Sequence, residues 1–131
     1  MRRAGGVLFV VAVSAVSACS RQDTRIQQHK EVFESLGATT AAIGRAWLSG
    51  AISGTYSKVA LEQTLRLVEQ ERTALTATPA SLADPRGAAL SQQAEQLSRL
   101  IAGMVSGVRD ADATVVRAHL ARIPIKPPDS K

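Results

Sequence analysis

The chain of 131 residues has one cysteine, no asparagine and only four aromatic side chains. A single cysteine cannot form a disulfide within the chain, so packing has to stabilise the fold. There are no Asn-Gly hairpin turns, and no segment shows the alternation of polar and apolar residues that is typical of a strand. The scarcity of aromatic side chains leaves little from which to build stacking platforms for bases or sugars. These absences favour an all-α protein and argue against nucleic acid as a partner.

Motifs that carry catalytic chemistry are also missing from the sequence. It contains no phosphate-binding loop, no dinucleotide fingerprint, no H-E-x-x-H zinc motif and no C-x-x-C-H haem attachment site. The Gly-Ala-Ile-Ser-Gly run at residues 50–54 lacks the spacing of a nucleophile elbow and lies between two predicted helices. We therefore expect neither an enzyme nor a cofactor-binding protein.

What the sequence does contain at its beginning is the pattern of a secretory signal peptide in residues 1–18. Arg2 and Arg3 are followed by an apolar run and then by the small residues Ser17 and Ala18. The apolar stretch from Gly5 to Ala18 is shorter than the about 20 residues that a membrane-spanning helix needs. This segment is therefore predicted to be cleaved.

The residues Val16-Ser17-Ala18-Cys19 resemble the lipobox of bacterial lipoproteins. The resemblance, which covers residues 1–20 only, implies that Cys19 receives a diacylglycerol group, becomes the first residue after cleavage and is then N-acylated. Ser20 after the cysteine implies sorting to the outer membrane, with the domain facing the periplasm. The alternative is an ordinary signal peptide cut nearby, which would leave a free thiol.

Beyond Cys19, apolar residues recur with helical spacing in four segments. A Thr24-Arg25-Ile26-Gln27 capping box is predicted to begin the first helix, and Gly50 and Gly54 to separate it from the second. Asp84 and Pro85 are predicted to cap and begin the third. The four predicted stripes are Ile26, Phe33, Leu36, Thr40, Ile43 and Trp47; Leu61, Leu65, Val68 and Leu75; Leu90, Ala94, Leu97, Ile101, Met104 and Val108; and Val116, Leu120 and Ile123.

Short links between these helices predict an antiparallel up-down-up-down four-helix bundle. The alternative is a three-helix bundle in which one unbroken helix covers residues 85–122. Glycines and two aspartates near residues 103–112 favour a break. The predicted organisation is a signal peptide at 1–18, a lipidated N-terminus and short tether at 19–23, a helical bundle domain at 24–123 and a Pro-rich flexible tail at 124–131.

Candidate contact residues are Trp47, Ile52 and Tyr56, which surround the predicted turn between the first two helices. A lipid at Cys19 would hold the Cys19 end of the bundle at the membrane and leave this turn, at the opposite end, accessible. Apolar and aromatic side chains are concentrated at contact sites. The alternative is that these three side chains only close the end of the core.

Two further sets of residues could bind a metal ion, although we expect no metal site. His29 and His119 would lie at one level in an antiparallel bundle, near Glu69 or Glu71, and could bind zinc. Histidines on helical stripes are also common packing residues. Asp110 and Asp112 could also be interpreted as a metal-binding pair, but a helix cap predicts the same residues, and we expect the cap.

The interpretation that we carry forward is a membrane-anchored, periplasmic, non-enzymatic interaction or structural module of the cell envelope. Its expected partners are the lipid bilayer, through Cys19, and an envelope protein. The alternative is a carrier of a small ligand, lipid or metal, since helical bundles can hold such ligands between their helices.

Overall fold

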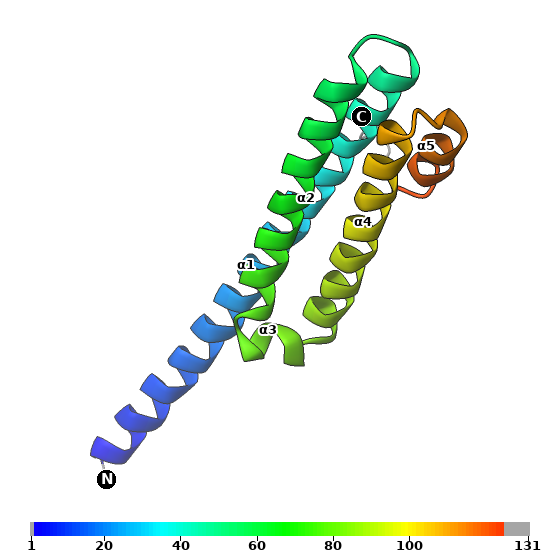
Figure 1. Ribbon diagram of the computed structural model, residues 1–131. Helices are drawn as coiled ribbons and strands as arrows, with labels where there is room; N and C mark the ends of the chain where they lie inside the picture. Colours follow the sequence, from blue (N-terminus) through cyan, green and yellow to red (C-terminus); the bar gives the residue numbers. More distant parts are fainter. Residues whose placement is uncertain (1, 125–131) are drawn as a thin grey trace.

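The computed structural model describes the backbone of residues 2–124 and the side chains of residues 21–124. Over this range the chain is all-helical and contains no strand, which confirms the prediction of an all-α protein. The helices are α1 (Arg2–Leu48), α2 (Gly54–Thr76), α3 (Pro79–Ala83), α4 (Pro85–Arg109) and α5 (Ala113–Leu120). The long helices α1, α2 and α4 lie side by side, and the short α5 packs beside one end of α4 (Figure 1).

Helix α1 is much longer than the sequence predicted. The expected start at Thr24 is wrong for the full-length chain, because α1 runs without interruption from Arg2 to Leu48. Residues 19–23, predicted to form a tether, are part of this helix. No glycine or proline lies between Gly6 and Gly37, so nothing in this stretch breaks the helix.

The connection between α1 and α2 lies at Gly50 and Gly54, as predicted, and local hydrogen bonds define its conformation. Gly50 has a φ of +77°, and the backbone N–H groups of Gly50 and Ala51 donate to the carbonyls of Trp47 and Ala46. This is the Schellman pattern, in which a residue with left-handed φ ends a helix. The Ser53 hydroxyl then accepts a hydrogen bond from the Tyr56 N–H at 3.1 Å and caps the start of α2.

The link from α2 to α4 contains the one-turn helix α3, which the sequence analysis did not predict. Pro79 begins α3, and Asp84 both ends it and caps α4. The Asp84 carboxylate accepts a hydrogen bond from the Arg86 N–H at 2.9 Å, and Pro85 is the first residue of α4. The predicted Asp-Pro start of this helix is confirmed.

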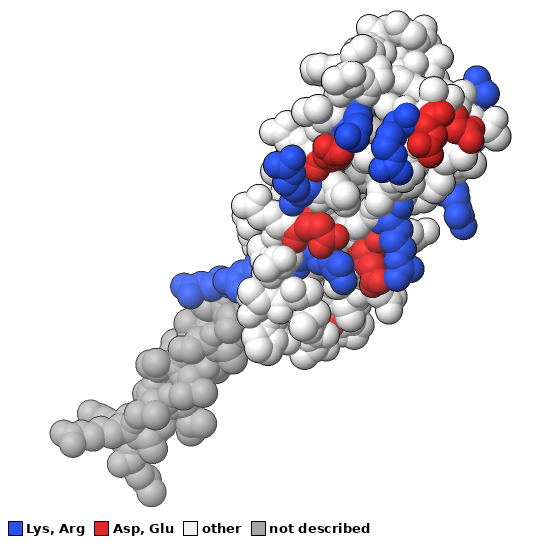
Figure 2. Space-filling view, viewed as in Figure 1, with Lys and Arg blue, Asp and Glu red and all other residues white. Residues whose placement is uncertain are grey.

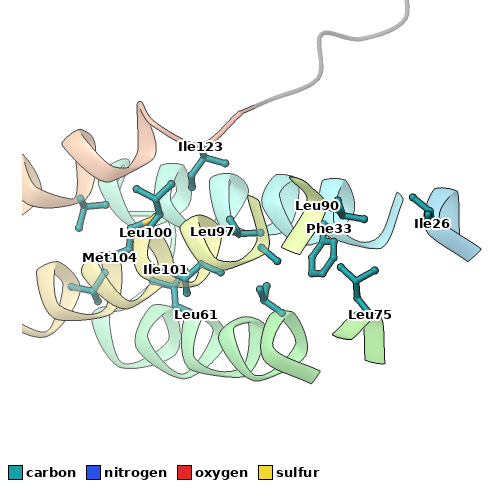
Figure 3. Close-up of a cluster of buried hydrophobic side chains, with 14 residues drawn as sticks. Ile26, Phe33, Leu61, Leu75, Leu90, Leu97, Leu100, Ile101, Met104 and Ile123 are labelled. Carbon is teal, nitrogen blue, oxygen red and sulfur yellow. The ribbon is translucent and has the colours of Figure 1, made fainter. Parts of the chain in front are cut away.

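The predicted apolar stripes form one contiguous core between the helices (Figure 3). Leu36, Ile43, Trp47, Leu65 and Leu120 are partly buried against it, and all other members of the four stripes are buried. α4 supplies the largest share of the core, because its buried residues face both α1 and α2 as well as α5.

A break separates α4 from α5, so the alternative of one continuous helix over residues 85–122 is wrong. The N–H groups of Ala111 and Asp112 donate to the carbonyls of Val108 and Gly107, which is again the Schellman pattern. Asp112 caps α5 by accepting a hydrogen bond from the Val115 N–H at 3.2 Å, as the cap interpretation predicted. The predicted tail begins at Pro124, and residues 125–131 lie outside the described residues.

Ala111 is the one described non-glycine residue with a positive φ, at 51°. A left-handed conformation costs a side-chain-bearing residue about 1–2 kcal/mol, and glycine avoids this cost. We therefore expect Ala111→Gly to raise the free energy of unfolding by about 0.5–1 kcal/mol, measured by denaturant unfolding followed by circular dichroism. The matched control, Ala118→Gly at an exposed position inside α5, should lower it by about 1 kcal/mol. Destabilisation by both changes would contradict the strain at Ala111.

Candidate functional site

The predicted lipid attachment residue, Cys19, lies within α1, and its side chain is outside the described residues. The N-terminal part of α1 projects beyond the other helices, and the α1–α2 connection is at the opposite end of the molecule (Figure 1). Over the part of the chain searched, no helix is both long enough and apolar enough to cross a membrane.

The three predicted contact residues lie in or next to the α1–α2 connection but differ in exposure. Trp47 is partly buried and packs against the core, with its indole nitrogen beside Gly54. Ile52 is partly exposed in the turn. Tyr56 is 63% exposed on the first turn of α2. Trp47 thus closes this end of the core, whereas Tyr56 presents its ring to solvent.

Two exposed apolar residues on α2 extend this surface, and the sequence analysis did not identify them. Val59 is 55% exposed and Leu67 is 46% exposed. At 100° per residue, Tyr56, Val59 and Leu67 fall within an arc of about 80° on α2. We call these three residues the outer α2 face. The sequence could have indicated this surface, because Val59 and Leu67 are large apolar residues that lie outside the predicted buried stripe of the same helix.

The structure separates the two histidines that the sequence predicted to lie at one level. His29 Nδ1 is 2.6 Å from Glu71 Oε1, which joins α1 to α2. His119 Nδ1 donates to the Val115 carbonyl within α5, and its ring lies against Gly103. The prediction that His29 and His119 lie at the same height along the bundle is wrong. The short helix α5 ends near Gly44, which is far along α1 from His29. In the described part of the chain, no group of three or more His, Cys, Asp or Glu residues is placed to hold a metal ion.

An apolar groove with a volume of about 480 Å³ lies between α1, α4 and the end of the described chain. Phe33 and Gly37 contribute from α1, and Leu97 from α4, while Ile123 lies at one end of the groove. This groove suits an apolar ligand, because most of the residues that line it are apolar and its volume lies within the range of about 300–1,000 Å³ that is typical of small-molecule pockets.

The charges on the face shown in Figure 2 alternate in sign. Lys58 and Glu62 pair within α2 at 3.6 Å. A second network joins α2 to α4, because Arg72 lies 3.6 Å from Glu69 and 3.8 Å from Glu95, and Glu95 also pairs with Arg99. These residues are partly exposed, so such pairs contribute little to stability. The mixture of signs produces no single-sign patch over these residues.

A separate cluster of polar side chains links α1 to the start of α4, at the opposite end of the molecule from the α1–α2 connection. The Arg86 guanidinium contacts both Asp84 and Asp23, and the Gln22 amide donates to the Ala80 carbonyl at 3.0 Å. Hydrogen bonds from the Arg86 guanidinium and from its backbone N–H lower the pKa of Asp84 from 3.8 to about 2. The Asp84 carboxylate therefore has two roles, as helix cap and as ion-pair partner.

This shift predicts a pH dependence with a defined sign. Because the pKa of Asp84 is lower in the folded state, its charge contributes stability above about pH 4, and this contribution is lost as the pH falls toward 2. Asp84→Asn keeps a capping side chain but removes the charge. Its melting temperature should be below that of the unsubstituted chain at pH 5, and the difference should shrink between pH 4 and pH 2. Arg86→Gln removes the other partner of the Asp84–Arg86 ion pair, and its melting temperature should show the same pH dependence. A difference unchanged down to pH 2 would contradict this role.

Comparisons with known proteins assign no family to this chain. No protein-family model, no curated protein and no solved structure matches it. Its function therefore has to be inferred from its own residues and geometry.

Proposed function

We propose that this chain is a lipoprotein of the outer membrane that faces the periplasm and acts as a non-enzymatic interaction module of the cell envelope. One observation carries the proposal: the N-terminal part of α1, the helix that contains the lipobox-like Cys19, projects at one end of the molecule, and the α1–α2 connection is at the opposite end (Figure 1). The exposed residues Tyr56 and Val59 follow this connection in the sequence. Such a placement suits a protein that is held at one end and makes contacts with the other.

The anchor in this proposal is covalent lipid on Cys19, namely a diacylglycerol group and an N-acyl chain. Each buried CH₂ group contributes about 0.8 kcal/mol, so a single chain binds marginally, whereas two or three chains anchor a protein stably. This requirement explains why the chain's one cysteine would follow directly on the apolar leader. The proposal involves no other cofactor.

For the helices, we propose the up-down-up-down four-helix arrangement with α5 as a short fourth member. The short links between the elements support it, because they favour antiparallel neighbours. From Cys19 to the end of α1 at Leu48, an α-helix extends about 44 Å at 1.5 Å per residue. In this arrangement the outer α2 face would be held tens of ångströms from the bilayer.

The proposed contact surface consists of the outer α2 face together with Ile52. Tyrosine is among the side chains that carry most of the binding energy at protein interfaces, and burial of the apolar surface of Val59 and Leu67 would add to it. Tyr56 is also anchored where it stands, because its backbone N–H donates to the Ser53 cap. The partner we propose is an envelope protein with a complementary apolar surface.

Carriage of a small apolar ligand is the second candidate function, and the groove between α1 and α4 is the observation that favours it. Phe33, Leu90 and Leu97 offer such a ligand an apolar floor. Saturable binding of an apolar fluorescent probe by the full chain would support this alternative.

The interaction proposal predicts that Val59→Asp leaves the fold intact but removes partner contact. Val59 is 55% exposed, so its substitution should change the free energy of unfolding by less than about 0.5 kcal/mol. The test places a photo-cross-linking amino acid at position 56 of the full chain in its native membranes. We expect a discrete higher-mass adduct that Val59→Asp reduces at least tenfold.

The matched control is Leu82→Asp, which adds the same charge at a comparably exposed residue, 44% exposed on α3. It should leave the adduct unchanged. The absence of any discrete adduct from position 56, or equal loss of the adduct in both variants, would contradict the assigned surface. Large destabilisation by Val59→Asp would assign this residue to packing instead.

A further inference from the structure

The apolar groove between α1 and α4 adjoins a second depression, which is polar. The groove and the polar depression share Gln96 and Leu100 of α4 as lining residues, so these two residues form the ridge between them. The polar depression has a volume of about 540 Å³ and lies between α4 and the C-terminal end of α5. A single ligand that crosses the ridge would therefore contact both.

Basic side chains outnumber acidic ones in the polar depression. Arg99 of α4 and Arg122, which follows α5, both line it. Glu95 is the one acidic residue among its described lining residues, and Arg72 shares that carboxylate with Arg99. Among the described residues, Arg122 has no ion-pair partner. Guanidinium groups bind phosphate through parallel N–H donors, so a phosphate group complements this depression.

His119 forms part of the wall of the polar depression but is not available as a donor. Its Nδ1 donates to the Val115 carbonyl at 2.8 Å, and its Nε2 lies against Gly103. The exposed side-chain amides of Gln92 and Gln96 also line the depression and can donate. A ligand would thus meet guanidinium and amide N–H groups, which suit the oxygen atoms of an anion.

The groove on the other side of the ridge has the opposite chemistry. Its floor residues Phe33, Leu90 and Leu97 are apolar, and from Leu90 to Leu97 the floor extends about 10 Å along α4. Lys30 and Glu34 contribute one charge of each sign, so the described charged residues of the groove have no net charge. An uncharged, elongated apolar group such as an acyl chain suits this groove.

We propose that the groove and the polar depression together bind an anionic single-chain lipid, with the acyl chain in the groove and a phosphate-bearing head at Arg99 and Arg122. This inference rests on the second candidate function, carriage of an apolar ligand in the groove, and defines that ligand more closely. Burial of the chain supplies affinity, because each CH₂ group removed from water contributes. The two arginines select a charged head over a neutral one.

Binding of three related ligands to the full chain, measured by isothermal titration calorimetry, tests this assignment. A Cys19→Ser background leaves no covalently attached acyl chain to compete for the groove. The ligands are myristoyl lysophosphatidic acid; monomyristin, which has the same chain without the phosphate; and glycerophosphate, which is the head without the chain. All are used below the concentrations at which they form micelles. We expect the complete lipid to bind at least tenfold more tightly than either of the other two.

Substitution of Arg122 tests the head site separately from the groove. Arg122 is exposed, so Arg122→Gln should leave the melting temperature unchanged. It should weaken binding of myristoyl lysophosphatidic acid about tenfold, because hydrogen bonds between charged groups are the strong ones, and leave binding of monomyristin unchanged. The matched control, Arg117→Gln, removes the same charge from an exposed position of α5 that lines neither the groove nor the polar depression. It should leave both affinities unchanged, and equal weakening by the two variants would overturn the head site.

Fluorescence quenching locates the acyl chain. Gln93→Trp places an indole at an exposed residue that lines the groove, and a brominated acyl chain quenches an indole that it contacts. We expect the brominated lipid to quench this variant. It should not quench the chain without this substitution, whose one tryptophan, Trp47, lies at the end of α1 next to the α1–α2 connection.

The outcomes separate this inference from the carrier function on which it rests. Equal affinity for monomyristin and the complete lipid would overturn the charged head but leave carriage of an apolar ligand in place. Equal affinity for glycerophosphate and the complete lipid, or quenching of Trp47 alone, would overturn the placement of the chain in the groove. Binding of none of the three ligands would overturn both this inference and the carrier function.

Discussion

The structure depends on the burial of the apolar residues of α4, which form the centre of the core. Ala94, Ile101 and Met104 are fully buried, and α4 packs against every other helix. Burial of a side chain such as isoleucine or methionine contributes about 1.5–3 kcal/mol. With one cysteine, the chain has no internal disulfide to supplement this packing. The links between the helices and the helix-capping residues then determine how the other helices pack against α4.

The approach of α5 to α4 illustrates this dependence. A side chain at Gly103 would overlap the His119 ring, and one at Gly107 would come within 2.8 Å of Val116. Because α5 packs tightly there and then ends, it covers only one part of α4 and leaves the groove beside Leu90 and Leu97. The glycines that suggested a helix break in the sequence are thus sites of close helix packing, and the break itself comes after them, at residues 110–112.

Sequence reasoning predicted the helices and their buried faces well, because apolar spacing and capping residues act locally. Asp84 and Gly50 show this in their hydrogen bonds and dihedral angles. It was wrong about the start of α1, where no breaking residue separates the apolar N-terminal stretch from the polar chain. It also misplaced His119, because the level of a histidine depends on how α5 packs. The outer α2 face was missed because exposure depends on which neighbours are absent, and spacing within one helix does not reveal that.

The proposed function depends on whether Cys19 carries lipid, and mass spectrometry of the protein extracted from bacterial membranes measures this directly. We predict a chain that begins at Cys19 and has a mass increased by a diacylglyceryl group and an N-acyl chain. The Cys19→Ser variant should carry neither modification. A chain that retains residues 1–18, or one cleaved elsewhere with an unmodified Cys19 thiol, would contradict the lipid anchor and with it the placement of this protein on the membrane.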